Sequence, residues 1–90
     1  MTHHRNVEIV NKRGLHARAS AKFVKLASEF DAEVTVSREG QKVDARSIMG
    51  LMMLGAGPGS TLDIDADGAD AESALDALCE LVQAGFHEDI

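Results

Sequence analysis

The stretch TLDIDAD at residues 61–67 constrains the fold more than any other part of the 90-residue sequence. Apolar Leu62, Ile64 and Ala66 alternate there with three aspartates. Because successive side chains of a strand point to opposite faces, this alternation predicts a strand with one buried face and one acidic, solvated face. Such a strand is typical of an antiparallel sheet that helices cover on a single face.

Other segments supply the remaining elements of that arrangement. Alternating or β-rich patterns predict strands at residues 6–10, 31–37 and 42–45, the last two joined by a hairpin turn at 38–41. Apolar residues at helical spacing predict helices from His16 to about Ser28, over 46–54 and over 68–86. The expected order is β-α-β-β-α-β-α, in a single two-layer α+β domain over residues 1–90.

Each expected helix has a stripe of apolar residues that we place in the core. In the first helix the stripe is Ala19, Phe23, Leu26, Ala27 and Phe30. In the second helix, which Ser47 is placed to cap, Ile48, Leu51, Met52 and Leu54 compete for the core. In the third helix, with Asp70 as the expected N-cap, the stripe is Ala71, Ala74, Leu75, Leu78 and Val82.

Composition argues against several classes of protein. With three Phe, no Trp, no Tyr and a net charge of −6, the chain lacks the aromatic platforms and positive charge of nucleic-acid binders. Its single cysteine, Cys79, has no partner for an internal disulfide, and metal-ligand spacings are absent. No apolar run approaches the length of a membrane span. We expect a cytoplasmic monomer without metal, cofactor or membrane insertion.

Charge is distributed unevenly along the chain. Residues 1–30 contain six Lys or Arg against two Glu, whereas residues 61–90 contain nine Asp or Glu and no Lys or Arg. The basic residues, which surround His16, are Arg5, Lys12, Arg13, Arg18, Lys22 and Lys25. A locally positive surface on a net-negative protein indicates an acidic partner or an anion as its ligand.

His16 lies where a loop is expected to become a helix. The backbone N–H groups of Ala17, Arg18 and Ala19 would lack acceptors in that helix, and a helix N-terminus of this kind favours anions. Arg18 adds a guanidinium suited to phosphate oxygens, and a neutral imidazole is a competent nucleophile. These residue types together indicate a phosphoryl acceptor. The alternative is an exposed histidine that merely begins the helix.

Ser47 and the methionines that follow it form a second candidate site. Serine is a preferred N-cap, so Ser47 is either a structural cap or a regulatory phosphosite at a helix start. Three methionines within five residues cannot all face inward. Core packing is the simpler interpretation for Met52, whereas we expect Met49 and Met53 on an adaptable docking surface. The GAGPGS loop, Cys79 and the other histidines (His3, His4 and His87) are expected to have no chemical role.

The stretches GLHARAS (14–20) and DARSIMGLM (44–52) together resemble the HPr family, the histidine phosphocarriers of the bacterial phosphoenolpyruvate phosphotransferase system. The resemblance implies an open-faced β-sandwich, in which three helices cover one face of a four-stranded antiparallel sheet. It covers nearly the whole chain. The stretch FDAEV, the run LMML and residues 85–89 are most similar to the nitrogen-related branch, NPr.

The resemblance also implies roles for particular residues. His16 would accept a phosphoryl group on Nδ1 from a phosphohistidine of Enzyme I, of the sugar or the nitrogen type, and pass it to an EIIA-type protein. Arg18 would contact that group, and Ser47 would be phosphorylated by HPr kinase/phosphorylase. Gly55 would lie where backbone packs near the active-site loop. The matching docking patch is Ile48 and Met49, and we extend the expected docking surface to Met52, Met53 and Lys25.

One residue departs from the family pattern. Many members have proline after the arginine, where this chain has Ala19. Because alanine keeps the backbone donor that proline lacks, we expect phosphoryl acceptance to be retained. Two alternatives to the carrier remain at this point: a regulatory docking module controlled mainly by Ser47 phosphorylation, and a generic α+β binding domain with neither role.

Overall fold

The computed structural model describes residues 2–88. Its elements are β1 (Thr2–Glu8), α1 (Ala17–Ala27), β2 (Glu33–Arg38), β3 (Gln41–Asp44), α2 (Ile48–Met53), β4 (Thr61–Asp67), α3 (Ala71–Gln83) and the 3₁₀ turn η1 (Gly85–His87). The expected order is confirmed, and η1 follows α3 as an additional short turn. None of the helices within these residues is long and apolar enough to cross a bilayer.

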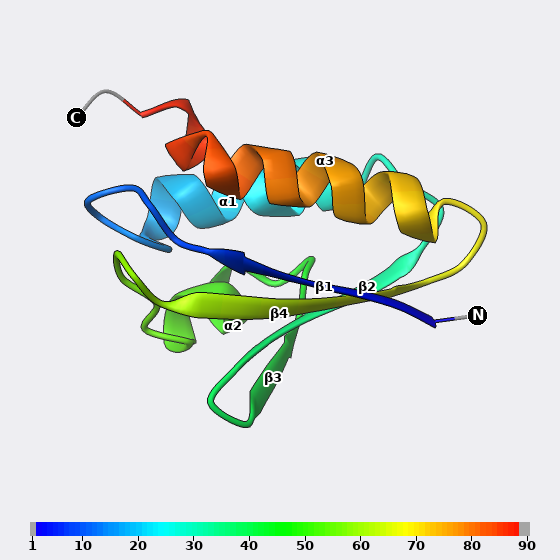
Figure 1. Cartoon of the computed structure of the whole chain (residues 1–90), viewed down its shortest axis with the longest axis horizontal. Coiled ribbons are helices and arrows are strands. Elements are labelled where there is room, and N and C mark those ends of the chain that lie inside the picture. The colour runs from blue at the N-terminus through cyan, green and yellow to red at the C-terminus, as the bar shows by residue number, and fades with distance from the viewer. Residues whose placement is uncertain (1, 89–90) are drawn as a thin grey trace.

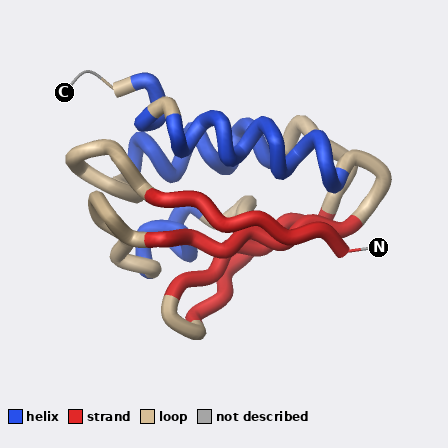
Figure 2. Tube along the Cα trace, in the orientation of Figure 1, coloured by secondary structure: helices blue, strands red, loops and turns tan. Residues whose placement is uncertain are grey.

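The four strands form one antiparallel sheet in the order β1-β4-β2-β3. The acidic strand is central: Ile64 of β4 pairs with Val36 of β2, and Leu62 pairs with Val7 of β1. All four of these side chains are buried. Helices α1 and α3 lie side by side over this apolar face (Figures 1 and 2), while α2 packs against α1 and β3. The open-faced β-sandwich is therefore confirmed.

The first strand differs from its expected bounds. It runs from Thr2 to Glu8 rather than over residues 6–10, and pairs along its whole length with β4. Residues 2–6 show no apolar alternation, because an edge strand needs only backbone pairing to one neighbour and can keep polar side chains. Ile9, beyond the strand, is nevertheless fully buried.

The expected core of α1 and α3 is largely confirmed, whereas that of α2 is partly wrong. The α3 stripe is buried throughout, and in α1 Leu26 and the following Phe30 are partly buried beside the fully buried Phe23. In α2, Leu51 and the C-cap residue Leu54 are buried, but Ile48 and Met52 are exposed. A helix of six residues makes fewer than two turns, so it presents only a narrow face to the core.

Asp70 occupies the N-cap position of α3 but does not cap it with its side chain. Its carboxylate accepts a hydrogen bond from the backbone N–H of Asp31 at 2.8 Å instead. Among the residues of the first turn, only Glu72 is acidic. Asp70 therefore ties the loop before β2 to the beginning of α3, a role that a local capping pattern does not reveal.

Candidate functional site

His16 is the N-cap residue of α1, with extended backbone angles of φ −74° and ψ 178°. Its carbonyl accepts the first helical hydrogen bond, from Ser20 N–H at 2.9 Å. The amides of Ala17, Arg18 and Ala19 precede that bond, so they have no acceptor within the helix. The imidazole makes no capping bond and keeps 21% of its side-chain surface exposed. The ring is therefore partly exposed and not enclosed in the core.

A close backbone contact shapes the loop before His16. Gly14 has a left-handed φ of +62°, and a Cβ built on it would lie 2.1 Å from the carbonyl oxygen of Ala56. The neighbouring Leu15 N–H donates to that same oxygen at 3.0 Å. Gly55, which the family resemblance places near this loop, precedes Ala56 in the chain, but a Cβ on Gly55 itself would meet nothing within 4 Å. The close contact between the two loops is therefore made by Gly14 and Ala56. It is possible because Gly14 has no Cβ that would collide with the Ala56 carbonyl.

Glu88 joins the site from beyond α3. One oxygen of its carboxylate accepts a hydrogen bond from Nε2 of His16, and the other accepts from Asn11 Nδ2 at 3.0 Å. The hydrogen bond from Asn11, followed by the hydrogen bond from His16 and the charge of Arg18, lowers the pKa of Glu88. Since the folded pKa is depressed, this contact stabilises the protein above the ordinary glutamate pKa, and the stabilisation is lost as pH falls through the lowered value.

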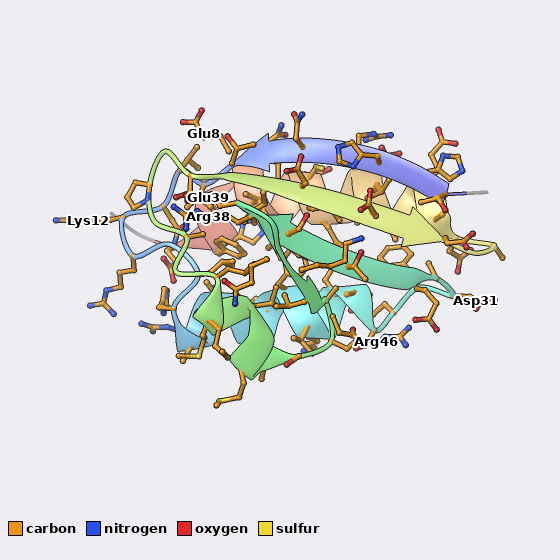
Figure 3. All side chains as sticks on the ribbon, turned by 90° about the horizontal axis from the view of Figure 1, so that it is seen from below. Glu8, Lys12, Asp31, Arg38, Glu39 and Arg46 are labelled. Atoms are coloured by element: carbon orange, nitrogen blue, oxygen red, sulfur yellow. The ribbon has the colours of Figure 1, made fainter. Side chains whose placement is uncertain are left out.

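A basic cleft of about 390 Å³ lies beside these groups, lined by Arg13, Arg18, Lys22, His87 and Glu88. Only part of the basic cluster in the sequence contributes to it. Arg5 forms an ion pair with Asp76 of α3 instead, and Lys12 points away from the molecule (Figure 3). Three cations therefore line a cleft beside His16, as a site for phosphate oxygens requires.

Ser47 is the N-cap of α2, as expected, and its Oγ accepts a hydrogen bond from Gly50 N–H at 2.9 Å. A Cβ on Gly50 would lie only 3.0 Å from that oxygen and from Val43 Cβ. At the other end of the helix, Arg38 Nη1 donates to the Leu54 carbonyl at 3.0 Å while its other nitrogen pairs with Glu39 (Figure 3). The short helix is thus held at both ends.

The exposed face of α2 is apolar. Met49 and Met53 have 72% and 68% of their surface exposed, and Ile48 and Met52 about two fifths, at 40% and 41%. Of the two interpretations of Met52, core packing is wrong, because Leu51 and Leu54 occupy the inward positions. Lys25, in the last turn of α1, is exposed as well. Since α2 packs against α1, an apolar surface lies near the helix that His16 begins.

Two members of the site, Asn11 and Glu88, are not predicted from the sequence. Asn11 is a loop residue only 3% exposed, and 72 positions separate His16 from Glu88, so no local pattern connects these residues. Residues 85–89 served only to suggest a branch of the family, and Asp89 lies outside the described residues. Cys79 is buried, and burial raises the pKa of its thiol, which keeps the thiol protonated and unreactive.

Comparison with known proteins shows the family to which the chain belongs. A family model described as the phosphorylation site of the phosphotransferase HPr component matches residues 3–84. The chain belongs to the HPr family. It is 54% identical to the phosphocarrier protein HPr of Cupriavidus necator over 93% of this chain and 94% of that protein. It is 52% identical to the phosphocarrier protein NPr of Shewanella violacea, over 93% and 92%.

Solved HPr structures share the fold as well. HPr-C-His from Thermoanaerobacter tengcongensis superimposes with a TM-score of 0.92 at 42% identity, covering 98% of this chain and 99% of that one. The chain is thus an HPr-type phosphocarrier protein of the phosphotransferase system. Identities to HPr and to NPr differ by only two percentage points, so the NPr branch stays a prediction.

Proposed function

We propose that His16 accepts a phosphoryl group on Nδ1 from a phosphohistidine of Enzyme I and passes it to an EIIA-type protein. The observation that supports this most strongly is the position of His16. It is the N-cap of α1, followed by three amides without helical acceptors and flanked by the cleft that Arg13, Arg18 and Lys22 line. Partial charges at the helix start and full charges on the side chains attract the same anion.

The transfer needs no proton movement at the reacting nitrogen. The lone pair of Nδ1 forms a bond to phosphorus while the bond from phosphorus to the donor imidazole breaks and returns its electron pair to that imidazole. The three phosphoryl oxygens keep their negative charge throughout, and the amides of Ala17, Arg18 and Ala19 and the Arg18 guanidinium stabilise it. Ala19 supplies an amide donor here that proline would lack. We place this relay in the cytoplasm.

Mapping the modified residue tests this proposal. The protein is incubated with phosphoenolpyruvate and Enzyme I, and the phosphorylated peptide is identified by mass spectrometry under alkaline conditions. We expect a single acid-labile phosphate on His16, transferable to an EIIA-type protein. Stable labelling of another residue, with His16 unmodified, would contradict the proposal.

Ser47 supports a second, regulatory function at the docking surface. Its oxygen lies at the start of α2, directly before the exposed Ile48 and Met49. A phosphate there would bring nearly two negative charges to the surface that we expect an acidic partner to contact. At about 5 Å and an effective dielectric of about 20, two unit charges repel by roughly 3 kcal/mol, which corresponds to about two orders of magnitude in affinity.

The variant pair Ser47→Asp and Ser47→Asn isolates this charge, because both residues are good N-caps and differ by one unit of charge. We expect Ser47→Asp to raise the KM of Enzyme I for this protein about tenfold over Ser47→Asn, after screening by salt. Steady-state phosphorylation kinetics at two ionic strengths measure the ratio of the two KM values and its dependence on salt. Equal KM values in the two variants would argue against electrostatic regulation at this position.

The regulatory docking module without carrier function makes a different prediction. HPr kinase/phosphorylase and ATP would place an acid-stable phosphate on Ser47, whereas Enzyme I would leave no acid-labile phosphate on His16. The two phosphates are distinguished by acid treatment of the labelled protein. We favour the carrier because the cations that line the cleft lie beside His16 and not beside Ser47.

A further inference from the structure

Glu88 contacts the ring nitrogen of His16 that the proposed transfer does not use. Its carboxylate accepts a hydrogen bond from Nε2, and within residues 2–88 Nδ1 has no hydrogen-bond partner. A carboxylate can only accept here, so the hydrogen of the neutral imidazole belongs on Nε2. Nδ1 then carries the lone pair. The match of the family model ends at residue 84, four residues before Glu88.

Asn11 holds this carboxylate in a defined orientation. Its Nδ2 group uses both hydrogens, one toward Glu88 at 3.0 Å and one toward the Gly14 carbonyl at 2.9 Å. Turning the amide over would place Oδ1 against two acceptors, so the direction of these bonds is determined by their chemistry. In this orientation Oδ1 is buried and has no partner among the described residues, which is unfavourable. Asn11 therefore holds Glu88 in place with its Nδ2 group, while its own Oδ1 accepts no hydrogen bond from the described residues.

The segment Gly85–Glu88, which we call the latch segment, is anchored independently of Glu88. Phe86 is fully buried, and its carbonyl accepts a hydrogen bond from Lys22 Nζ at 2.7 Å. Phe86 and His87 both have left-handed backbones, with φ of 56° and 57°, a conformation that residues other than glycine adopt only when their surroundings enforce it. Burial of the phenyl ring thus turns the chain back and directs Glu88 toward the start of α1.

We infer that Glu88 is a positioning residue for phosphoryl transfer, which keeps the hydrogen of His16 on Nε2 and so presents Nδ1 as the nucleophile. This inference rests on the proposed function. When Nδ1 forms its bond to phosphorus, Nε2 retains its hydrogen and the ring acquires a positive charge. The carboxylate bonded to Nε2–H stabilises that charge while it develops. At the same time the bond between phosphorus and the donor imidazole breaks, and its electron pair returns to the donor.

Glu88 is not suited to act as a blocking anion. A carboxylate that imitated the phosphoryl group would occupy Nδ1 or the helical amides, whereas Glu88 occupies Nε2. The two nitrogens point in divergent directions from the ring, so a phosphoryl donor can approach Nδ1 while Nε2 stays bonded. Nδ1, the nitrogen that accepts the phosphoryl group, therefore remains accessible while Glu88 is bonded to Nε2.

Two substitutions of Glu88 separate positioning from a structural role. In Glu88→Gln, Asn11 still donates, so the amide oxygen takes that contact and the NH₂ group faces Nε2 of His16. This reverses the direction of the bond and places the hydrogen on Nδ1, where it blocks the nucleophile. Glu88→Ala removes the contact without reversing it. A structural role predicts greater damage from Ala than from the isosteric Gln, whereas positioning predicts the opposite order.

The experiment measures the single-turnover rate constant for transfer from phospho-Enzyme I at saturating concentration, together with KM, for the full chain. We expect Glu88→Gln to lower the rate constant about tenfold and Glu88→Ala by less, both with unchanged KM. The matched control is Glu29→Gln, an exposed carboxylate just after α1. We expect ¹⁵N NMR to show the hydrogen on Nε2 in the parent and on Nδ1 in the Gln variant.

Each outcome has a defined meaning. Equal rate constants for the parent and Glu88→Gln, or a slower Ala than Gln variant, would overturn the positioning role while leaving the carrier function intact. A change confined to KM would overturn it as well, since it would indicate docking. A parent that takes no phosphate on His16 would overturn the proposed function itself, a result recognisable before any variant is compared.

Discussion

His16→Gln is expected to take up no acid-labile phosphate from phosphoenolpyruvate and Enzyme I. Glutamine is similar in size and polarity to histidine, but its amide nitrogen has no lone pair available to attack phosphorus. The helical amides and Arg18 remain, yet they bind charge without forming a bond. We expect a loss of at least about a thousandfold in the rate of phosphoryl uptake, as for removal of other covalent nucleophiles.

The control for this variant is His4→Gln. His4 lies on the acidic outer face of the sheet, where Nδ1 contacts Asp65 at 2.7 Å and Nε2 lies 3.5 Å from Asp63. It is thus removed from α1, and its loss should leave uptake unchanged. Radiolabel or intact-mass measurement before and after acid treatment quantifies both variants. Persistent acid-labile label on His16→Gln would identify another residue as the acceptor.

Gly14→Ala is expected to cause a large loss of stability, because Gly14 is buried in the loop before His16. Its left-handed φ of +62° disfavours a side chain, and the new methyl carbon would lie 2.1 Å from the Ala56 carbonyl oxygen. The new Cβ is bonded directly to the Gly14 backbone, and the oxygen belongs to the Ala56 backbone. Neither atom can rotate away, so one of the two loops must move. We expect the free energy of unfolding to fall by about 3 kcal/mol, combining conformational strain with the clash. For a domain of this size, that lowers Tm by about 15 °C.

Gly55→Ala is the matched control, because Gly55 has the same φ of +62° but open space around its Cβ position. It should lose only the conformational part, about 1 kcal/mol. Urea unfolding of both variants gives the comparison. Equal losses of stability in the two variants would show that the loop accommodates the added methyl group without a clash with Ala56.

Gly14→Ala should also transfer phosphate more slowly than the parent. The Gly14 carbonyl accepts the hydrogen bond from Asn11 that helps to orient Glu88, so movement of this loop would disturb Glu88.

The docking surface shows where sequence patterns stop being sufficient. Alternation identified β4, and helical spacing identified the buried faces of α1 and α3, because each of these patterns spans enough residues to define a face. Over the six residues of α2 the same spacing was ambiguous: it left Ile48 and Met52 competing for the core, whereas both are exposed. Packing against α1 and β3 decided which side of this short helix faces inward.

The candidate site likewise has one part that the sequence predicts and another that only the tertiary structure reveals. From the residues alone, His16, Arg18 and the amides of Ala17 to Ala19 were predicted as an anion site, since these groups are neighbours along one helical turn and their proximity is local. The sequence likewise determined the order of the elements and the cap at Ser47, which also depend on neighbours. Only the tertiary structure placed Glu88 against His16 and Asn11 against Glu88. It also paired Arg5 with Asp76 and gathered Arg13, Arg18 and Lys22 around one cleft. Contacts between residues as far apart as His16 and Glu88 depend on how the helices pack on the sheet, and no period along the chain specifies that packing.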